Sequence, residues 1–255
     1  MLTNEEQKRI ECLTESNAEF KDILDSITAE NRLILSKFTH ELRNPLTLVK
    51  STLQLIEQKH PETKEFKYWN SLGSDLDEMT DILNELSIYN HCNELHCAPC
   101  NLYELLTSTV ERFQPLTLAK NLTLTFTCAE TCKDYLTSYS CDCVKLKQAF
   151  TNLLKNAVEA ADESTQITTT VSVTSDTEEQ NGVTYIDIAV TNSGTPIPEE
   201  ELSQIFEPFV TFKTGGTGLG LAIAKKAVSL HCGNLSVSQT DTTISFHIQL
   251  PIHSK

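Results

Sequence analysis

A histidine flanked by polar residues stands in the middle of a long helical pattern. His40 is followed directly by Glu41, and Asn44 lies one helical turn further along the same side. A neutral, solvent-facing imidazole is a good nucleophile toward phosphorus, and a nearby carboxylate can take its proton. Pro45 is expected to loosen or bend the helix, because it cannot donate a hydrogen bond to residue 41. Taken alone, a helical histidine beside a glutamate is usually just a solvated pair.

Two asparagines four residues apart form a second candidate site. Asn152 and Asn156 share one face of a predicted helix, and apolar residues cover its other side. Paired amide oxygens suit a hard cation such as Mg²⁺, which is held partly by protein and partly by phosphate oxygens. Ordinary polar exposure explains two asparagines equally well when nothing else supports the pair.

Glycines are concentrated in one loop of the C-terminal half. Of eight glycines, four fall within residues 214–221, directly before an apolar helical pattern. Glycines let backbone amides crowd a polyphosphate, and a helix N-terminus favours an anion. The spacing fits neither a dinucleotide fingerprint, since Leu stands at 221, nor a P-loop, since no Gly-Lys-Ser/Thr follows. A glycine loop by itself is weak evidence for a nucleotide site.

The elements that carry His40 are helical up to about residue 90. Apolar residues alternate by three and four from Ile10, and Asn17 and Asn31 occupy two of the heptad a positions, which favours a parallel coiled coil. One amphipathic helix packed on its own chain is the alternative. Residues 59–62, Lys-His-Pro-Glu, break the pattern before a second apolar stripe over 69–86. Two such helices have no closed core, so two hairpins are predicted to pair into a dimeric four-helix bundle.

Strands and helices mix beyond about Leu95. Helices are predicted over about 102–114, 143–161 and 219–231, and strands over 122–128, 167–174, 184–191, 234–238 and 243–250. The polar stretch 175–182 is predicted to be a hairpin loop. Strands joined mostly by hairpins predict helices on one face of a mixed or antiparallel sheet.

The overall composition excludes several classes of function. A net charge of −15 and a pI near 4.8 argue against nucleic-acid binding. No run reaches the roughly 18 apolar residues that a membrane helix needs, and the start does not resemble a secretory signal. The chain is therefore expected to be cytoplasmic, without membrane insertion.

Nine cysteines are present, and Cys97-x-x-Cys100 has metal-ligand spacing beside His91, Cys92 and His96. A second such pair with matching context is missing, so further cysteines at 128, 132, 141 and 143 could be recruited only by the fold. Reduced thiols are the simplest interpretation, and a structural metal is the less favoured one.

In order and spacing, these motifs resemble the transmitter region of sensor histidine kinases, whose ATP domain is similar to those of the gyrase, Hsp90 and MutL group. The resemblance runs from about Leu33 to Leu250. Five segments carry it: 38–45 resembles the H box, 152–157 the N box, 192–198 the first glycine box, 206–209 the F box and 216–221 the second glycine box.

The resemblance implies an α + α/β fold: a coiled coil (1–36), a dimeric phosphoacceptor hairpin (37–95) and a two-layer α/β ATP-binding domain (96–255). It implies that His40 accepts phosphate from ATP, that Glu41 assists as base, and that Asn44 orients water for dephosphorylating a regulator. The implied cofactors are ATP and Mg²⁺, with Asn156 as the metal ligand. The implied partners are a second copy of the chain and a response-regulator receiver domain.

The resemblance also implies a nucleotide site. Its residues are Asn152, Lys155, Asn156, Asn192, Gly194, Ile197, Phe206, Phe209, Lys213, Gly216, Thr217, Gly218, Leu219 and Gly220. Gly194 is expected to let the chain pass close to adenine, the later glycines to shape a phosphate lid, and the two phenylalanines to anchor that lid. For Lys155 and Lys213 a solvated lysine is the simpler interpretation.

One departure from the family pattern concerns adenine recognition. The family usually has Asp where this chain has Asn192. Asn still accepts a hydrogen bond from the adenine amino group but loses charge assistance, a loss of about 1 kcal/mol or about fivefold in affinity. Pro196, in place of a usual glycine, stiffens the same loop.

The sequence contains no recognisable sensing module, so a separate sensory protein is expected to dock on the coiled coil, or the coil simply holds the dimer. The ATP domain is expected to swing on residues 90–101 to reach His40.

The alternative to an active kinase is a catalytically weak or inactive scaffold that binds or inhibits a kinase or regulator. Asn192 favours this alternative, whereas His40, Asn156 and the full glycine loop oppose it. An ATP-driven clamp lacks the extra domains with which such clamps close.

Overall fold

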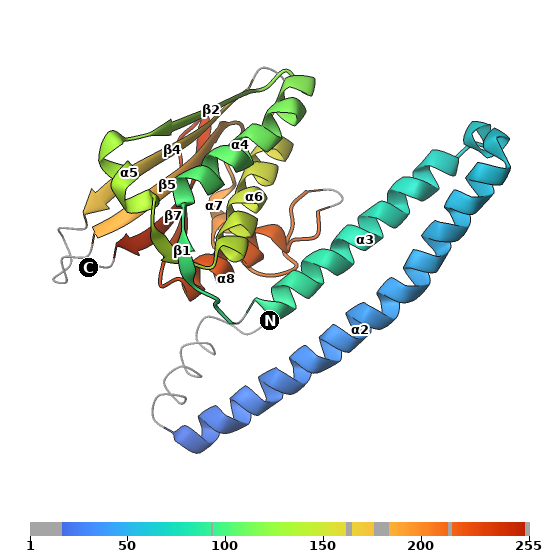
Figure 1. The fold of residues 1–255 in the computed structure, drawn as a ribbon, viewed down its shortest axis with the longest axis horizontal. Coiled ribbons are helices and arrows are strands. Elements are labelled where there is room, and N and C mark those ends of the chain that lie inside the picture. The colour runs from blue at the N-terminus through green and yellow to red at the C-terminus, as the bar shows by residue number, and fades with distance from the viewer. Residues whose placement is uncertain (1–16, 93, 162–164, 176–183, 214–215, 253–255) are drawn as a thin grey trace. The chain divides into compact units, whose positions relative to one another are not determined.

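The structure is a computed structural model that describes residues 17–92, 94–161, 165–175, 184–213 and 216–252. The chain divides into two compact units, Met1–His91 and Cys92–Lys255 (Figure 1). Within the described ranges, no helix combines the length and the hydropathy needed to cross a membrane.

The first unit is a helical hairpin. Helix α2 (Ala18–Lys59) is followed by the short 3₁₀ helix η1 (Pro61–Glu65) and by α3 (Trp69–His91). The predicted break at residues 59–62 is confirmed, because His60 ends α2 and Pro61 opens the 3₁₀ turn. Helix α2 continues through Pro45 without interruption.

The start of α2 corrects one expectation. Asn17 was expected at an a position inside a continuous helix, but it is the N-cap of α2, and its side chain accepts a hydrogen bond from the Phe20 N–H at 3.2 Å. An asparagine suits both roles, and heptad spacing alone does not separate them. Ile10 and Leu13, the earlier positions of that pattern, lie outside the described residues.

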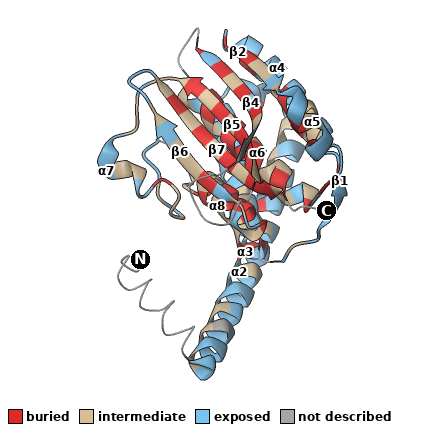
Figure 2. Ribbon diagram, turned by 90° about the vertical axis from the view of Figure 1, so that its left-hand side faces the viewer, coloured by how far each residue is buried: buried red, intermediate tan, exposed pale blue. Residues whose placement is uncertain are grey.

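The hairpin has a thin interior. Leu46 and Leu76 are its buried apolar residues among those described, and Arg43 Nη2 donates to Asn84 Oδ1 at 3.1 Å across the two helices. Figure 2 shows α2 largely exposed. Apolar side chains that are 42–59% exposed run along both helices: Ile27, Ile34, Phe38, Leu42, Val49, Leu72 and Met79. One hairpin therefore leaves an apolar surface uncovered.

The second unit contains a five-stranded sheet in the order β2-β4-β5-β7-β6 and a two-stranded sheet of β1 and β3. Its elements are β1 (Ala98–Cys100), α4 (Leu102–Ala119), β2 (Thr123–Cys128), α5 (Glu130–Leu136), β3 (Tyr139–Cys141), α6 (Cys143–Ala160), β4 (Gln166–Ser175), β5 (Thr184–Ser193), α7 (Glu199–Leu202), α8 (Gly220–Leu230), β6 (Asn234–Gln239) and β7 (Thr243–Ile252). Strands β2 and β4 pair in parallel, and the other neighbours in the large sheet are antiparallel. The predicted mixed sheet is confirmed.

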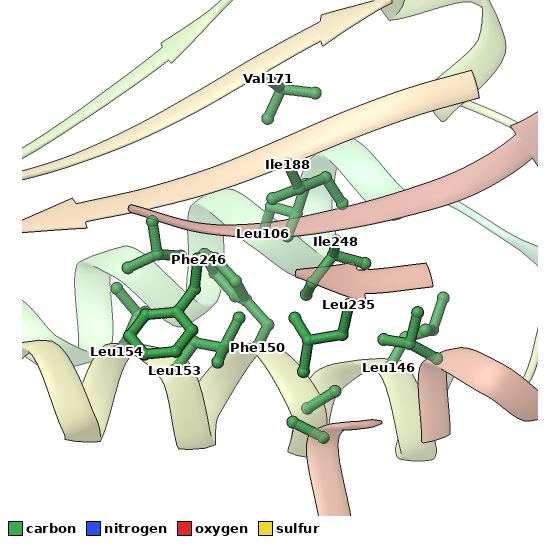
Figure 3. Packing of buried hydrophobic residues seen from close by; sticks show 14 of the residues in the cluster. Leu106, Leu146, Phe150, Leu153, Leu154, Val171, Ile188, Leu235, Phe246 and Ile248 are labelled. Carbon is green, nitrogen blue, oxygen red and sulfur yellow. The ribbon is translucent and has the colours of Figure 1, made fainter. Parts of the chain in front are cut away.

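The core lies between this sheet and helices α4, α6 and α8 (Figure 1). Figure 3 shows Leu153 and Leu154 of α6 gathered around Phe246 of β7. These side chains and Phe150 are at most 2% exposed. Full burial of side chains of this size contributes roughly 1.5–3 kcal/mol each. This packing fixes the axis of α6, on whose surface the two asparagines lie.

Four short elements of this unit, β1, β3, α5 and α7, were not predicted from the sequence. Helix α4 extends beyond its predicted end at 114, through Pro115, to Ala119. The short strands carry only three residues each, too few for a periodic pattern. The predicted hairpin loop at 175–182 lies almost wholly outside the described residues.

Candidate nucleotide-binding and phosphoacceptor sites

His40 is exposed in the middle of α2, on the helical unit. Glu41 and Asn44 are exposed beside it, and Glu41 Oε1 lies 3.9 Å from Lys37 Nζ. Because Pro45 has no N–H, the carbonyl of Glu41 lacks its usual helical partner. The three predicted residues therefore share one stretch of accessible helix surface. Thr39 and Leu46, on the opposite side, are buried.

The other predicted residues belong to the sheet unit, where Asn152 holds the glycine loop against α6. Asn152 Nδ2 donates to the Gly220 carbonyl at 2.9 Å, and its Oδ1 accepts from Gln148 Nε2 at 3.1 Å. The side chain is 7% exposed. A buried amide with both ends bonded positions its neighbours, because breaking either bond leaves a buried polar group unpaired. Asn152 therefore sets where α8 begins.

Asn156, one turn further along α6, is half-buried, and its amide oxygen accepts a hydrogen bond from a lysine ammonium group. Lys213 Nζ donates to Asn156 Oδ1, and it lies 3.6 Å from Glu159 Oε2. Partial burial lowers the pKa of Lys213 from its ordinary value, and the Glu159 carboxylate opposes that shift. Lys155 is exposed, with its Nζ 4.0 Å from Glu159 Oε1.

The segment after β5 is held in place by backbone and amide hydrogen bonds. Gly194 N–H donates to the Thr242 carbonyl at 3.1 Å. Gln239 forms a two-way amide pair with Ile197, accepting its N–H at 2.9 Å and donating to its carbonyl at 2.8 Å. A Cβ on Gly194 would lie 3.3 Å from Asn192 Nδ2 and 3.5 Å from the Ala160 carbonyl oxygen. The close contact is with the Asn192 amide, which a side chain at 194 would have to displace, whereas the Ala160 oxygen at the end of α6 lies at an ordinary van der Waals distance.

Asn192 is 1% exposed at the end of β5. Its Nδ2 donates to the Ser193 carbonyl at 3.2 Å. That bond uses the donor end of the amide and leaves Oδ1 as the end available to accept.

The second glycine segment is fastened to the segment at 206–209. Phe209 N–H donates to the Gly218 carbonyl at 3.0 Å. Both residues have positive φ, 65° for Phe209 and 68° for Gly218. A Cβ on Gly218 would lie 2.6 Å from the Phe209 carbonyl carbon and from the Val210 oxygen. Gly218 is thus required by conformation and by space, and Phe209 is one of the few residues other than glycine with positive φ among those described.

The remaining predicted residues support the same loop. Gly216 N–H donates to the Lys213 carbonyl at 3.3 Å, and Leu219 N–H donates to Thr217 Oγ1 at 3.2 Å. Leu219 is buried and is the N-cap of α8. Phe206 packs edge-to-face on Phe246, with ring centroids 6.4 Å apart, whereas Phe209 is 58% exposed. Only Phe206 of the two phenylalanines is therefore anchored in the core.

Three residues that position this site were not singled out from the sequence: Gln148, Glu159 and Gln239. Gln148 lies four residues before Asn152 on one helix face, a spacing that does predict contact. Gln239 reaches Ile197 across 42 residues, and Glu159 reaches Lys213 across 54, so local sequence spacing contains no signal for either contact.

These residues fit a nucleotide with a hard cation. The cation on Asn156 Oδ1 is the ammonium of Lys213, which stands where a metal bound to that oxygen would stand. The amide oxygen belongs to the ligand class that Mg²⁺ accepts. Beside it, the glycine loop leads into the N-terminus of α8, which favours phosphate.

Two family descriptions match the chain. Residues 30–90 match the His Kinase A (phospho-acceptor) domain, and residues 141–252 match the Histidine kinase-, DNA gyrase B-, and HSP90-like ATPase. Sporulation kinase C of Bacillus subtilis (strain 168) is 28% identical over 230 residues, 90% of this chain and 50% of that protein. The sensory histidine kinase/phosphatase NtrB of Rhizobium leguminosarum bv. phaseoli is 25% identical over 228 residues, 86% of this chain and 57% of that protein.

Solved structures of histidine kinases are also similar to this chain. The nucleotide-free catalytic domain of histidine kinase ThkA is 30% identical, with a TM-score of 0.53, over 62% of this chain and 96% of that one. Full-length ShkA in complex with AMPPNP shares the fold at 23% identity, with a TM-score of 0.69, over 87% of this chain and 46% of that one.

The chain spans half or less of the length of the first curated relatives that it matches. Both halves of the histidine kinase transmitter are nevertheless present in order, one bearing an exposed histidine and the other the fastened glycine loop. The chain belongs to the histidine kinase family, with a phospho-acceptor domain followed by an ATPase domain of the gyrase and HSP90 type.

Proposed function

We propose that the chain is a protein-histidine kinase that binds ATP with Mg²⁺, phosphorylates His40 and passes the phosphoryl group to an aspartate of a response-regulator receiver domain. The observation that supports this proposal most strongly is that the four predicted nucleotide segments, 152–157, 192–198, 206–209 and 216–221, are joined to one another around α6. Asn152 bonds Gly220, Lys213 bonds Asn156, Phe209 bonds Gly218, and Gly194 lies next to the Asn192 amide and within van der Waals reach of Ala160 in α6. Such mutual fastening is what a preorganised phosphate site requires.

The proposed reaction uses few groups of this chain. An imidazole nitrogen of His40 forms a bond to the γ-phosphorus, the bond to the β–γ bridging oxygen breaks, and ADP leaves. The imidazole proton passes to Glu41, the adjacent exposed carboxylate. Bound at Asn156 Oδ1 and at phosphate oxygens, Mg²⁺ would neutralise charge on the phosphates. Lys213 must leave Asn156 for this to happen, and it then becomes free to meet a phosphate oxygen.

Adenine recognition follows from the orientation of Asn192. Because Nδ2 is used by the Ser193 carbonyl, Oδ1 is the end that would accept the adenine amino group. The substitution for Asp therefore preserves the hydrogen-bond pattern and loses only charge assistance. The retained hydrogen-bond acceptor favours an active kinase over an inactive scaffold.

We further propose a homodimer formed through the exposed apolar side chains of α2 and α3, with residues 1–36 contributing a coiled-coil segment, 37–95 the phosphoacceptor hairpin and 96–255 the ATP domain. Burying apolar side chains that are about half exposed in one hairpin gives a hydrophobic driving force for pairing.

Asn44 is the proposed residue for orienting water in regulator dephosphorylation. A sensory protein that engages the N-terminal segment is the proposed source of input.

The test is incubation of the purified dimer with γ-labelled ATP and Mg²⁺. Acid-labile, base-stable label is expected on the parent chain and absent from His40→Ala. His60→Ala is the matched control, because His60 is another exposed histidine paired with a glutamate, its Nδ1 3.1 Å from Glu62 Oε1. Label that persists in His40→Ala contradicts the assignment. ATP binding without label on a folded dimer favours the scaffold instead.

A further inference from the structure

Three cysteines from β1, β3 and α6 converge at the N-terminal end of α6, outside the predicted nucleotide site. Cys100 ends β1, Cys141 ends β3, and Cys143 is the first residue of α6. Their three sulfur atoms all lie within 4.8 Å of one another. Cys100 and Cys141 are buried, and Cys143 is half-buried. The sequence offered Cys97-x-x-Cys100 without a second pair, and the fold supplies that second pair as Cys141-x-Cys143.

Two local features create the convergence. In the antiparallel β1–β3 register Cys100 lies opposite Tyr139, so Cys100 and Cys141 fall on the same face of the small sheet. Asp142 then turns the chain into α6, accepting the Lys145 N–H at 3.1 Å as N-cap and the His96 N–H at 3.2 Å. The turn brings Cys143 back to the same side, at a helix N-terminus that favours a thiolate.

The structure joins Cys100 and Cys143 by a disulfide, so the expected state with every thiol reduced is wrong for this pair. Cys141 stays a free thiol next to that bond. A disulfide uses two cysteines and does not explain why a third lies beside them. A tetrahedral metal site does explain it, because such a site takes three or four thiolate ligands. Metal–sulfur bonds of about 2.3 Å place those sulfurs about 3.8 Å apart. Cys141 Sγ already lies within 4.8 Å of the other two sulfurs, whereas the bonded Cys100 and Cys143 sulfurs must be reduced and move apart to reach that spacing.

We propose that, when its thiols are reduced, the unit Cys92–Lys255 binds one Zn²⁺ through Cys100, Cys141 and Cys143. The fourth position is open to the exposed Cys97, three residues before Cys100, or to water. Binding releases the thiol protons to solvent and changes no oxidation state. The ion would tie the β1–β3 sheet to the N-terminus of α6. The disulfide is the oxidised alternative of the same sulfurs, so metal and disulfide exclude each other.

The test uses the full chain, reduced with a phosphine under anaerobic conditions, loaded with Zn²⁺ and freed of unbound metal by gel filtration. Elemental analysis is expected to give about one zinc per chain. Co²⁺ in place of zinc should give a thiolate-to-metal charge-transfer band and the d–d bands of a tetrahedral site. A folded, reduced chain that retains less than about a tenth of a zinc overturns the proposal.

Substitution separates metal from disulfide. Cys141→Ala keeps an apolar side chain and leaves the Cys100–Cys143 pair able to oxidise, but it should lower zinc content at least about tenfold. Cys143→Ser, at a half-buried position, should do the same and also abolish the disulfide. Cys128→Ser, a partly exposed cysteine on β2, is the control and should retain full zinc. Equal zinc in all three variants, each shown to be folded by circular dichroism, contradicts the proposal.

Discussion

The two units place their proposed chemistry in opposite ways. His40 lies exposed on one long helix, whereas the nucleotide segments are held by hydrogen bonds between elements far apart in sequence. His40 is therefore suited to act as an accessible nucleophile, whereas the nucleotide segments are suited to hold a ligand in a fixed position. Substitution at His40 should therefore remove chemistry without loss of stability, and substitution at the tightly packed Gly218 of the glycine loop should reduce both.

The largest expected effect is at Gly218. Gly218→Ala puts a Cβ 2.6 Å from the Phe209 and Val210 backbone at a positive φ, so it should destabilise the sheet unit by about 3 kcal/mol and weaken ATP binding at least about tenfold. Gly220→Ala is the matched control, because its Cβ would have no neighbour closer than 3.9 Å. Urea unfolding and calorimetric titration with ATP measure both; equal losses in the two variants contradict the account.

Asn192→Asp should have opposite effects on stability and affinity. Without nucleotide, a carboxylate that is 1% exposed faces the Ser193 carbonyl and loses the Nδ2 bond, which should cost about 1–2 kcal/mol. With ATP, charge assistance to the adenine amino group should raise affinity about fivefold. The measurements are unfolding with and without ATP and the ATP dissociation constant. Unchanged affinity would remove Asn192 from the adenine site.

Thr169 tests the core outside the site. Its Oγ1 is buried and has no hydrogen-bond partner among the residues that the structure describes. Thr169→Val keeps the shape and removes the unpaired hydroxyl, so it should stabilise the unit by about 1 kcal/mol and leave ATP binding unchanged. Denaturant unfolding gives the stability. A destabilised Val variant would show that the hydroxyl has a partner, such as a buried water.

The smallest effect concerns His247 on the face of the sheet away from the helices. Its Nδ1 lies 3.1 Å from Asp187 Oδ2, and its other ring nitrogen is 2.9 Å from Ser238 Oγ. The hydrogen bond to Asp187 raises the pKa of His247, and partial desolvation opposes the rise. The pair therefore stabilises the fold fully below about pH 6.5, the unfolded pKa, and that contribution disappears as pH rises through the higher folded pKa. Asp187→Asn should flatten this dependence in unfolding measured from pH 5 to 8; an unchanged slope contradicts it.

Sequence reasoning predicted the regular elements well because long amphipathic stretches have a clear period. The buried face of α6, the β4–β5 and β6–β7 hairpins and the break at His60 all lie where the pattern put them. It failed at three-residue strands, and it took Asn17 for a helix-interior position. The contacts of Gln239, Glu159 and the three cysteines depend on tertiary approach over tens of residues, which local periodicity does not encode.

The most direct measurement compares the parent chain with His40→Gln for label, ATP affinity and unfolding in parallel. The account predicts that His40→Gln loses the acid-labile label completely, while its ATP affinity and its free energy of unfolding match the parent, because the side chain is exposed. Label retained on the variant, or an ATP affinity that falls together with stability, would contradict the separation of an accessible phosphoacceptor from a fixed nucleotide site.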